Sequence, residues 1–137
     1  MKEEKRTHVG AYGLIIKDGK VALIKKARGG YTGLLDLPGG GIEHTESPEE
    51  TLKRELMEEA GVEVTNYELI GVSSFNLKWP YKEKNIIEDL HHIGILYKVE
   101  LKDYKLKESP DGLDSNGCFF YEIDELSSSE ITPFTKF

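Results

Sequence analysis

The stretch that decides the fold covers residues 39–62 and reads GGGIEHTESPEETLKRELMEEAGV. Its second half carries the start signals of a helix. Ser47 can N-cap the helix, Pro48 suits the first helical position, and Glu50 completes a Ser-x-x-Glu capping box. Because Gly61 can serve as the C′ residue, we predict a helix over residues 48–60, about 20 Å long at roughly 1.5 Å per residue.

This helix would be apolar on one face and acidic on the opposite face. The apolar stripe, which repeats every four residues, consists of Leu52, Leu56 and Ala60. On the acidic face, Glu58 follows Glu55 by three positions and Glu59 follows it by four, so their Cβ atoms lie about 5–6 Å apart. Three carboxylates at that spacing repel one another. A hard cation with oxygen ligands removes the repulsion, and magnesium bridging to phosphate is the usual case.

The residues before and beside the acids support the same interpretation. Three consecutive glycines, at positions 39–41, allow the backbone to approach a ligand where a β-carbon would obstruct it. Arg54 is next to the acids and could pair with Glu46 or Glu55, which would orient one carboxylate through a bidentate contact. The pattern therefore predicts a rigid site for a metal and a phosphate group.

Residues 40–62 resemble the signature of the Nudix hydrolase family, which runs Gly, five residues, Glu, seven residues, Arg-Glu-aliphatic-x-Glu-Glu-x-Gly-aliphatic. Every defined position matches, with Leu56 and Val62 as the aliphatic residues. A chance match is very rare, because each residue type makes up only several per cent of proteins. The resemblance implies an α+β fold, a Nudix-like α/β/α sandwich with a mixed β-sheet. It also implies hydrolysis of a nucleoside diphosphate linked to another group, by water attack on phosphorus.

The resemblance further implies a role for each signature residue. The groups expected to bind the metal are the backbone carbonyl of Gly39 and the carboxylates of Glu55, Glu58 and Glu59. Arg54 and Glu46 resemble the ion pair that positions the catalytic glutamate. Glu55 is expected to orient or deprotonate the attacking water, with Glu58 as the alternative. The expected cofactor is Mg2+, with Mn2+ as an alternative.

Four residues outside the signature are candidates for binding the substrate. Lys26 and Arg28 follow a predicted strand near the expected mouth of the site, where they could neutralise substrate phosphates. A solvent-facing role explains both equally well. Trp79 and Tyr81 could stack on a nucleobase, although a loop tryptophan can also pack on its own domain.

Other polar residues have structural interpretations beside functional ones. One of His91 and His92 is expected to point inward, as a structural histidine or as a base or phosphate contact. Glu88 and Asp89 could add a further carboxylate to the site. Cys118 is expected to be a small core residue.

The rest of the chain reads as strands arranged around the helix. Strands are predicted at residues 9–16, 21–24, 34–37, 62–72, 90–101 and 118–121. Residues 76–89 read as an exposed loop or hairpin, and residues 123–129 as the start of a terminal helix. Without a repeat or a linker, residues 1–137 are expected to form one Nudix hydrolase domain.

Charge and composition narrow the class of protein. A net charge of −7 argues against a protein that grips extended nucleic acid, but not against a small nucleotide bound through a metal. The single cysteine excludes an internal disulfide, and no apolar stretch approaches the roughly 20 residues of a membrane span. We expect a cytoplasmic protein that acts on a small nucleotide-like diphosphate and binds no membrane. A homodimer is one option for its assembly.

Two other functions fit part of the sequence. Nudix-like modules that sense a nucleotide without cleaving it typically lose signature glutamates, whereas this chain keeps all of them. An isoprenyl diphosphate isomerase shares the fold but needs a catalytic cysteine and a longer chain, and Cys118 lies late in a short one. Hydrolysis is the reading that explains the whole signature.

Overall fold

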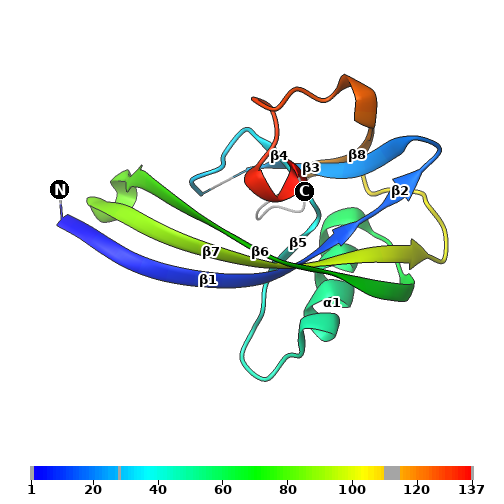
Figure 1. Ribbon diagram of the computed structural model, residues 1–137, viewed down its shortest axis with the longest axis horizontal. Helices are drawn as coiled ribbons and strands as arrows, with labels where there is room; N and C mark the ends of the chain where they lie inside the picture. Colours follow the sequence, from blue (N-terminus) through cyan, green and yellow to red (C-terminus); the bar gives the residue numbers. More distant parts are fainter. Residues whose placement is uncertain (1, 28, 110–114, 137) are drawn as a thin grey trace.

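The computed structural model describes residues 2–27, 29–109 and 115–136, which form two β-sheets and one α-helix (Figure 1). The long sheet has the strand order β5-β1-β7-β6. Its strands are β1 (Lys2–Leu14), β5 (Gly39–Gly41), β6 (Val64–Tyr81) and β7 (Ile86–Leu101). β1 runs parallel to β7 and antiparallel to β5, and β6 runs antiparallel to β7. The predicted mixed sheet is therefore present.

The short sheet is antiparallel and centred on β3 (Lys20–Lys26). β2 (Ile16–Lys17) and β4 (Leu35–Asp36) follow one edge of β3, and β8 (Ser115–Glu122) follows the other. β2 and β3 form a hairpin around the Asp18-Gly19 turn, in which both turn residues have positive φ. The short sheet brings β4, and the chain that follows it, to the end of α1 that carries the acids.

α1 covers residues Pro48–Ala60, as predicted. Both bonds of the capping box are present: the Ser47 side chain accepts from the N–H of Glu50, and the Glu50 side chain accepts from the N–H of Ser47, each at 3.1 Å. Gly61 ends the helix in a left-handed conformation with φ of 67°. These local signals act without tertiary help, which is why the sequence alone defines both ends.

Two cores lie on the two faces of β1, in accordance with the alternation of side chains along a strand. Ala11 faces a core that contains Leu52 and Leu56 of α1. The next residue, Tyr12, faces a core that contains Leu96 and Phe134. α1 therefore covers one face of the long sheet, and the C-terminal residues pack on the other.

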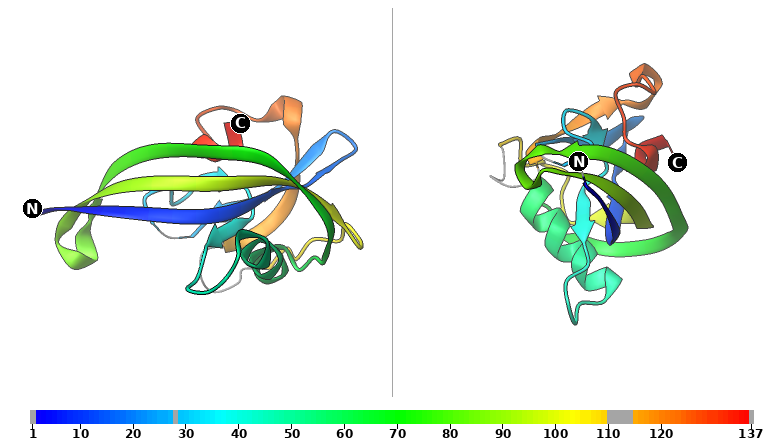
Figure 2. Two further views of the ribbon diagram at one scale, coloured as in Figure 1. Left: turned by 60° about the horizontal axis from the view of Figure 1, so that its bottom comes forward. Right: turned by 90° about the vertical axis from the view of Figure 1, so that its left-hand side faces the viewer.

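The β6–β7 hairpin is longer than predicted. Residues 76–89, expected as an exposed loop or a hairpin, belong to the hairpin: the strands expected at residues 62–72 and 90–101 continue through them and meet at a 3-10 turn, η1 (Lys82–Lys84). Pro80 is tolerated because β6 is an edge strand, where the missing N–H breaks no ladder bond. The hairpin tip and the N-terminal end of β1 project together, away from α1 and the short sheet (Figure 2).

The terminal helix predicted at residues 123–129 is wrong. A 3-10 turn, η2 (Ile123–Glu125), is followed by irregular chain and by a second 3-10 turn, η3 (Pro133–Lys136). Serines cause the difference: the N–H of Ser129 donates to the Ser127 hydroxyl at 3.4 Å, and such local bonds compete with a helix. Among the described residues, α1 is the one α-helix, and no helix is long and apolar enough to cross a membrane.

Candidate active site

Arg54 organises the acidic face of α1. Its Nε and Nη2 atoms donate to the two oxygens of Glu46 at 2.7 and 2.9 Å, which is a bidentate contact. Nη1 donates to Glu55 at 2.8 Å and lies 3.4 Å from Glu58. Hydrogen bonding from Arg54 lowers the pKa of Glu46 to about 2, and the bond to Glu46 raises the pKa of Arg54. One guanidinium therefore holds three carboxylates in place.

Glu59 points from the same helix into the protein. Its side chain is 1% exposed, and its Oε1 accepts the backbone N–H of Gly39 at 2.7 Å. Its Oε2 is buried and has no hydrogen-bond partner. Burial raises the pKa of Glu59 to about 9, although the hydrogen bond from Gly39 acts in the opposite direction. A positively charged ligand would lower that pKa and would occupy the unused oxygen.

The three glycines bring β5 against both β1 and α1. A β-carbon on Gly40 would lie 2.6 Å from the carboxyl carbon of Glu55. One on Gly39, whose φ is 148°, would lie 2.2 Å from the carbonyl oxygen of Ala11. Neither position has room for a larger residue. The glycines therefore allow Glu55 to lie against the backbone of β5.

The acids have the chemistry of a site for a hard divalent cation. Their carboxylate oxygens suit Mg2+ or Mn2+, and the unpartnered Oε2 of Glu59 is an available donor. As they stand, no three His, Cys, Asp or Glu side chains within the described ranges are arranged to hold a metal ion. Contacts within the protein explain this, because Glu55 and Glu58 face Arg54 while Glu59 faces Gly39. The donor atoms of these residues therefore have the chemistry that such a cation requires.

Lys26 contributes positive charge to the same place. It is the last residue of β3, and its backbone N–H donates to Leu34 at 2.9 Å. Burial raises the pKa of both Glu59 and Asp36, and the charge of Lys26 opposes each shift. Lys26 therefore acts electrostatically on both buried acids, while its predicted contact with substrate phosphates stays a prediction. Arg28 lies outside the described residues.

Trp79 and Tyr81 lie far from the acids along the long sheet. Trp79 is level with residue 4 of β1, whereas Gly40 is level with Ala11. Seven residues of strand span about 23 Å at roughly 3.3 Å per residue. The two rings stack on each other with their centroids 4.7 Å apart. Their predicted contact with a nucleobase would require a ligand that spans this distance.

Glu88 belongs to the cluster around Trp79 and not to the acidic face. Its side chain is 5% exposed, accepts the indole N–H of Trp79 at 2.9 Å, and forms an ion pair with Arg6 at 3.2 Å. The alternative that Glu88 adds a carboxylate to the site is therefore wrong. Cys118 is a buried core residue, as predicted.

A buried tyrosine–histidine pair was not predicted. Tyr12 Oη and His92 Nε2 are hydrogen-bonded at 2.6 Å, and His92 Nδ1 is buried without a partner. Burial lowers the pKa of His92 to about 3, so its ring is neutral near pH 7. Burial also raises the pKa of Tyr12, and the charges of Asp36 and Glu59 raise it further. Of His91 and His92, it is His92 that points inward. Its partner, Tyr12, is brought to it by the parallel register of β1 and β7.

Known proteins resemble this chain in sequence. The NUDIX domain profile matches residues 4–136. The ADP-ribose pyrophosphatase of Methanocaldococcus jannaschii is 30% identical over 118 residues, covering 86% of this chain and 63% of that protein. The RNA pyrophosphohydrolase of Saccharophagus degradans is 39% identical over 67 residues, 49% of this chain and 39% of that protein. The 8-oxo-dGTP diphosphatase of Proteus vulgaris is 34% identical over 71 residues, covering 51% of this chain and 63% of that protein. The chain thus spans less than two thirds of each of these relatives.

Solved structures share the fold. A MutT NUDIX hydrolase from Burkholderia pseudomallei superimposes with a TM-score of 0.75 at 23% identity, covering 96% of this chain and 94% of that one. A MutT protein from Bacillus halodurans gives a TM-score of 0.68 at 28% identity, covering 94% of this chain and 77% of that one. These likenesses confirm the predicted α+β Nudix fold with its mixed sheet. The match over residues 4–136, together with the complete signature on β5 and α1, shows that this chain belongs to the Nudix family.

Proposed function

We propose that the protein hydrolyses a diphosphate linkage in a nucleoside diphosphate joined to another group, in a Mg2+-dependent reaction in which water attacks phosphorus. The Arg54 network beside the buried, incompletely partnered Glu59 carries this proposal. The names of the relatives support it, since they are a pyrophosphatase, a pyrophosphohydrolase and a diphosphatase.

The site residues divide into metal ligands and positioning groups. The proposed ligands are the carbonyl of Gly39 and the carboxylates of Glu55, Glu58 and Glu59. A bound Mg2+ would neutralise charge on the transferring oxygens and lower the pKa of a bound water. Arg54, fixed by Glu46, holds Glu55 at 2.8 Å, so Glu55 is the better oriented acceptor for the proton of the water. Glu58, at 3.4 Å from Arg54, is the alternative.

The substrate contacts follow from charge. Lys26 is proposed to bind substrate phosphates, because its charge already acts on the buried acids. Arg28 is proposed for the same role from its place in the sequence. Stacking of a base on Trp79 or Tyr81 stays a prediction, as do the cytoplasmic location and the homodimer.

The test is a hydrolysis assay on a panel of nucleoside triphosphates, nucleotide sugars and dinucleotides, with and without Mg2+. Release of phosphate or nucleoside monophosphate is measured for the natural chain, for Glu58→Gln, and for Glu88→Gln as a matched control. We expect Mg2+-dependent cleavage that Glu58→Gln loses and Glu88→Gln keeps. Binding of a panel member without cleavage would instead identify a nucleotide-sensing module. Full activity in Glu58→Gln would contradict the assigned site.

A further inference from the structure

Residues 130–135, here called the C-terminal strap, cross β4 next to the active site. The N–H of Leu35 donates to the carbonyl of Glu130 at 2.7 Å, and the N–H of Thr132 donates to the carbonyl of Leu35 at 2.9 Å. Leu35 and Ile131 form a parallel bridge. The strap therefore bonds both the N–H and the carbonyl of Leu35, the first residue of β4. The proposed chemistry uses no side chain of the strap.

A buried side-chain contact links the strap to the segment that leads into β5. Asp36 and Thr132 are 2% and 1% exposed. The Thr132 hydroxyl donates to Asp36 Oδ1 at 2.6 Å, and the N–H of Leu37 donates to the same oxygen at 2.8 Å. One carboxylate oxygen thus receives one bond from the strap and one from the chain approaching the site. A buried carboxylate held by two donors fixes the backbone on both sides of it.

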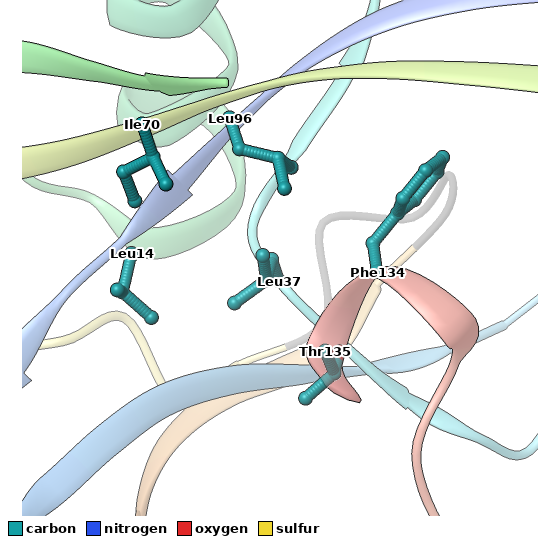
Figure 3. A pocket seen from close by; sticks show the side chains of 6 residues that line it. All are labelled: Leu14, Leu37, Ile70, Leu96, Phe134 and Thr135. Carbon is teal, nitrogen blue, oxygen red and sulfur yellow. The ribbon is translucent and has the colours of Figure 1, made fainter. Parts of the chain in front are cut away.

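Phe134 anchors the strap on its apolar side. Its ring centroid lies 5.2 Å from that of Tyr12 and 4.6 Å from that of His92. A β-carbon on Gly94 would lie 2.8 Å from the ring, so the missing side chain at that position makes room for it. Figure 3 shows Phe134 and Thr135 on η3, with Leu37 beside them in the lining of a small apolar pocket that contains no carboxylate. The strap is therefore seated by packing as well as by hydrogen bonds.

Two residues, Leu37 and Pro38, separate Asp36 from Gly39, whose amide holds Glu59. The carbonyl of Pro38 accepts the N–H of Gly13 at 2.9 Å, and the N–H of Gly39 donates to Glu59 at 2.7 Å. Gly39 has a φ of 148°, a conformation that glycine adopts freely and leaves just as freely. The N–H of Gly39 lies in the same peptide plane as the Pro38 carbonyl, so its direction is set by what holds the chain before it.

We propose that Thr132 is a positioning residue of the active site: through its bond to Asp36 it holds the segment before β5 so that the N–H of Gly39 points at Glu59. The effect on turnover rests on the proposed function. The effect on the Gly39 amide does not, because it concerns the metal-free protein alone.

The first test is amide hydrogen exchange with 15N NMR on the metal-free full chain. Thr132→Val removes the hydroxyl and keeps the branched shape, while Thr132→Ser keeps the hydroxyl. We expect the Gly39 amide of Thr132→Val to exchange about tenfold faster and to shift upfield, because losing one buried bond changes a local opening equilibrium by about that factor. The Lys102 amide, bonded to Glu63 at 3.0 Å, is the internal control and should not change. Thr132→Ser should resemble the natural chain.

Two outcomes would overturn the proposal. One is a Gly39 amide that Thr132→Val leaves unchanged. The other is equal acceleration at Gly39 and Lys102, which would indicate global destabilisation and not positioning. If Thr132→Val does not fold, Asp36→Asn replaces it, since an amide oxygen keeps the shape but accepts more weakly than a carboxylate. The same selective change at Gly39, smaller in size, is then expected, and its absence would overturn the proposal in the same way.

The second test measures turnover on whichever substrate the hydrolysis panel identifies. We expect Thr132→Val to lower kcat about tenfold with little change in KM, and to raise the Mg2+ concentration for half-maximal activity, because supporting groups around a metal site typically contribute about 10–100-fold. Thr132→Ser should restore both values, and its failure to do so would contradict the positioning role. If the natural chain cleaves nothing, the proposed function fails, while the exchange result still decides the positioning of Gly39.

Discussion

Glu59 and Glu88 are both buried carboxylates, but they differ in how completely their oxygens are hydrogen-bonded. Each oxygen of Glu88 has a donor, one from the Trp79 indole and one from the Arg6 guanidinium. Glu59 has one backbone donor, an oxygen without a partner, and a pKa raised by burial to about 9. Buried charge is normally paired, and Glu88 follows that rule. Incomplete pairing, and not burial alone, distinguishes the carboxylate that we assign to the active site.

The largest expected effect comes from exchanging each of these carboxylates for an amide. Glu59→Gln should lower kcat about 100-fold or more, since even the supporting groups of a metal site contribute about 10–100-fold. Glu88→Gln should leave kcat within a factor of about three and destabilise the fold, because it weakens two buried bonds. Steady-state kinetics and urea unfolding of both variants test this. Equal losses of activity would remove the distinction between the two sites.

The next effect concerns the group that orders the exposed acids. Arg54→Lys keeps the charge but cannot form the bidentate contact to Glu46 while also reaching Glu55. We expect kcat/KM to fall about 10–100-fold, the range found for groups that support metal ligands. Lys53→Arg, a change at the neighbouring exposed residue, is the control. An unchanged kcat/KM in Arg54→Lys would contradict the proposed orienting role of this residue.

The pKa of Glu59 predicts how the stability of the metal-free protein depends on pH. In the unfolded chain Glu59 loses its proton near pH 4.5, but in the folded chain it keeps the proton up to about pH 9. The unfolded state then binds fewer protons within this window, so stability should fall as the pH rises from about 4.5 to about 9. Melting temperatures in EDTA should show a flatter profile for Glu59→Gln than for the natural chain.

The smallest expected effect tests the completely paired carboxylate. Trp79→Phe keeps an aromatic ring next to Tyr81 but removes the indole N–H that Glu88 accepts. We expect a loss of about 0.5–1.5 kcal/mol in the free energy of unfolding, the usual contribution of one hydrogen bond. Urea denaturation measures this loss, and activity should not change. A marked increase in KM would instead support the predicted contact between Trp79 and the base of the substrate.

Local signals in the sequence were sufficient to predict α1 and its charged network. The capping box from Ser47 to Glu50 and the C′ glycine define the helix, and helical spacing places Arg54 among the acids. The extent of the β6–β7 hairpin was not predictable in this way. Its turn contains no glycine, and the required left-handed conformation falls on Asn85, with φ of 51°. From the sequence, residues 76–89, which are rich in lysine and contain a proline, fitted a loop as well as a hairpin, and the structure shows the hairpin.

The rest of the site depends on residues that are far apart in the chain. The Tyr12–His92 pair spans 80 positions and the Asp36–Thr132 pair spans 96. No helical or strand period connects such residues, because only the parallel register of β1 with β7 and the path of the strap bring them together. The spacing of the acids indicated the chemistry, whereas the buried groups behind them could be recognised only in the folded chain.

The parallel pairing of β1 with β7 has a consequence for synthesis on the ribosome. Lys2 is opposite Ile86 and Leu14 is opposite Lys98, so β1 must wait until residues 86–98 have been made before its main partner exists. Contacts this distant in sequence form slowly, and an unpaired strand is exposed to aggregation in the meantime. A nascent chain that has just reached Val62 would contain every signature residue, but not β7, the strand that pairs with β1.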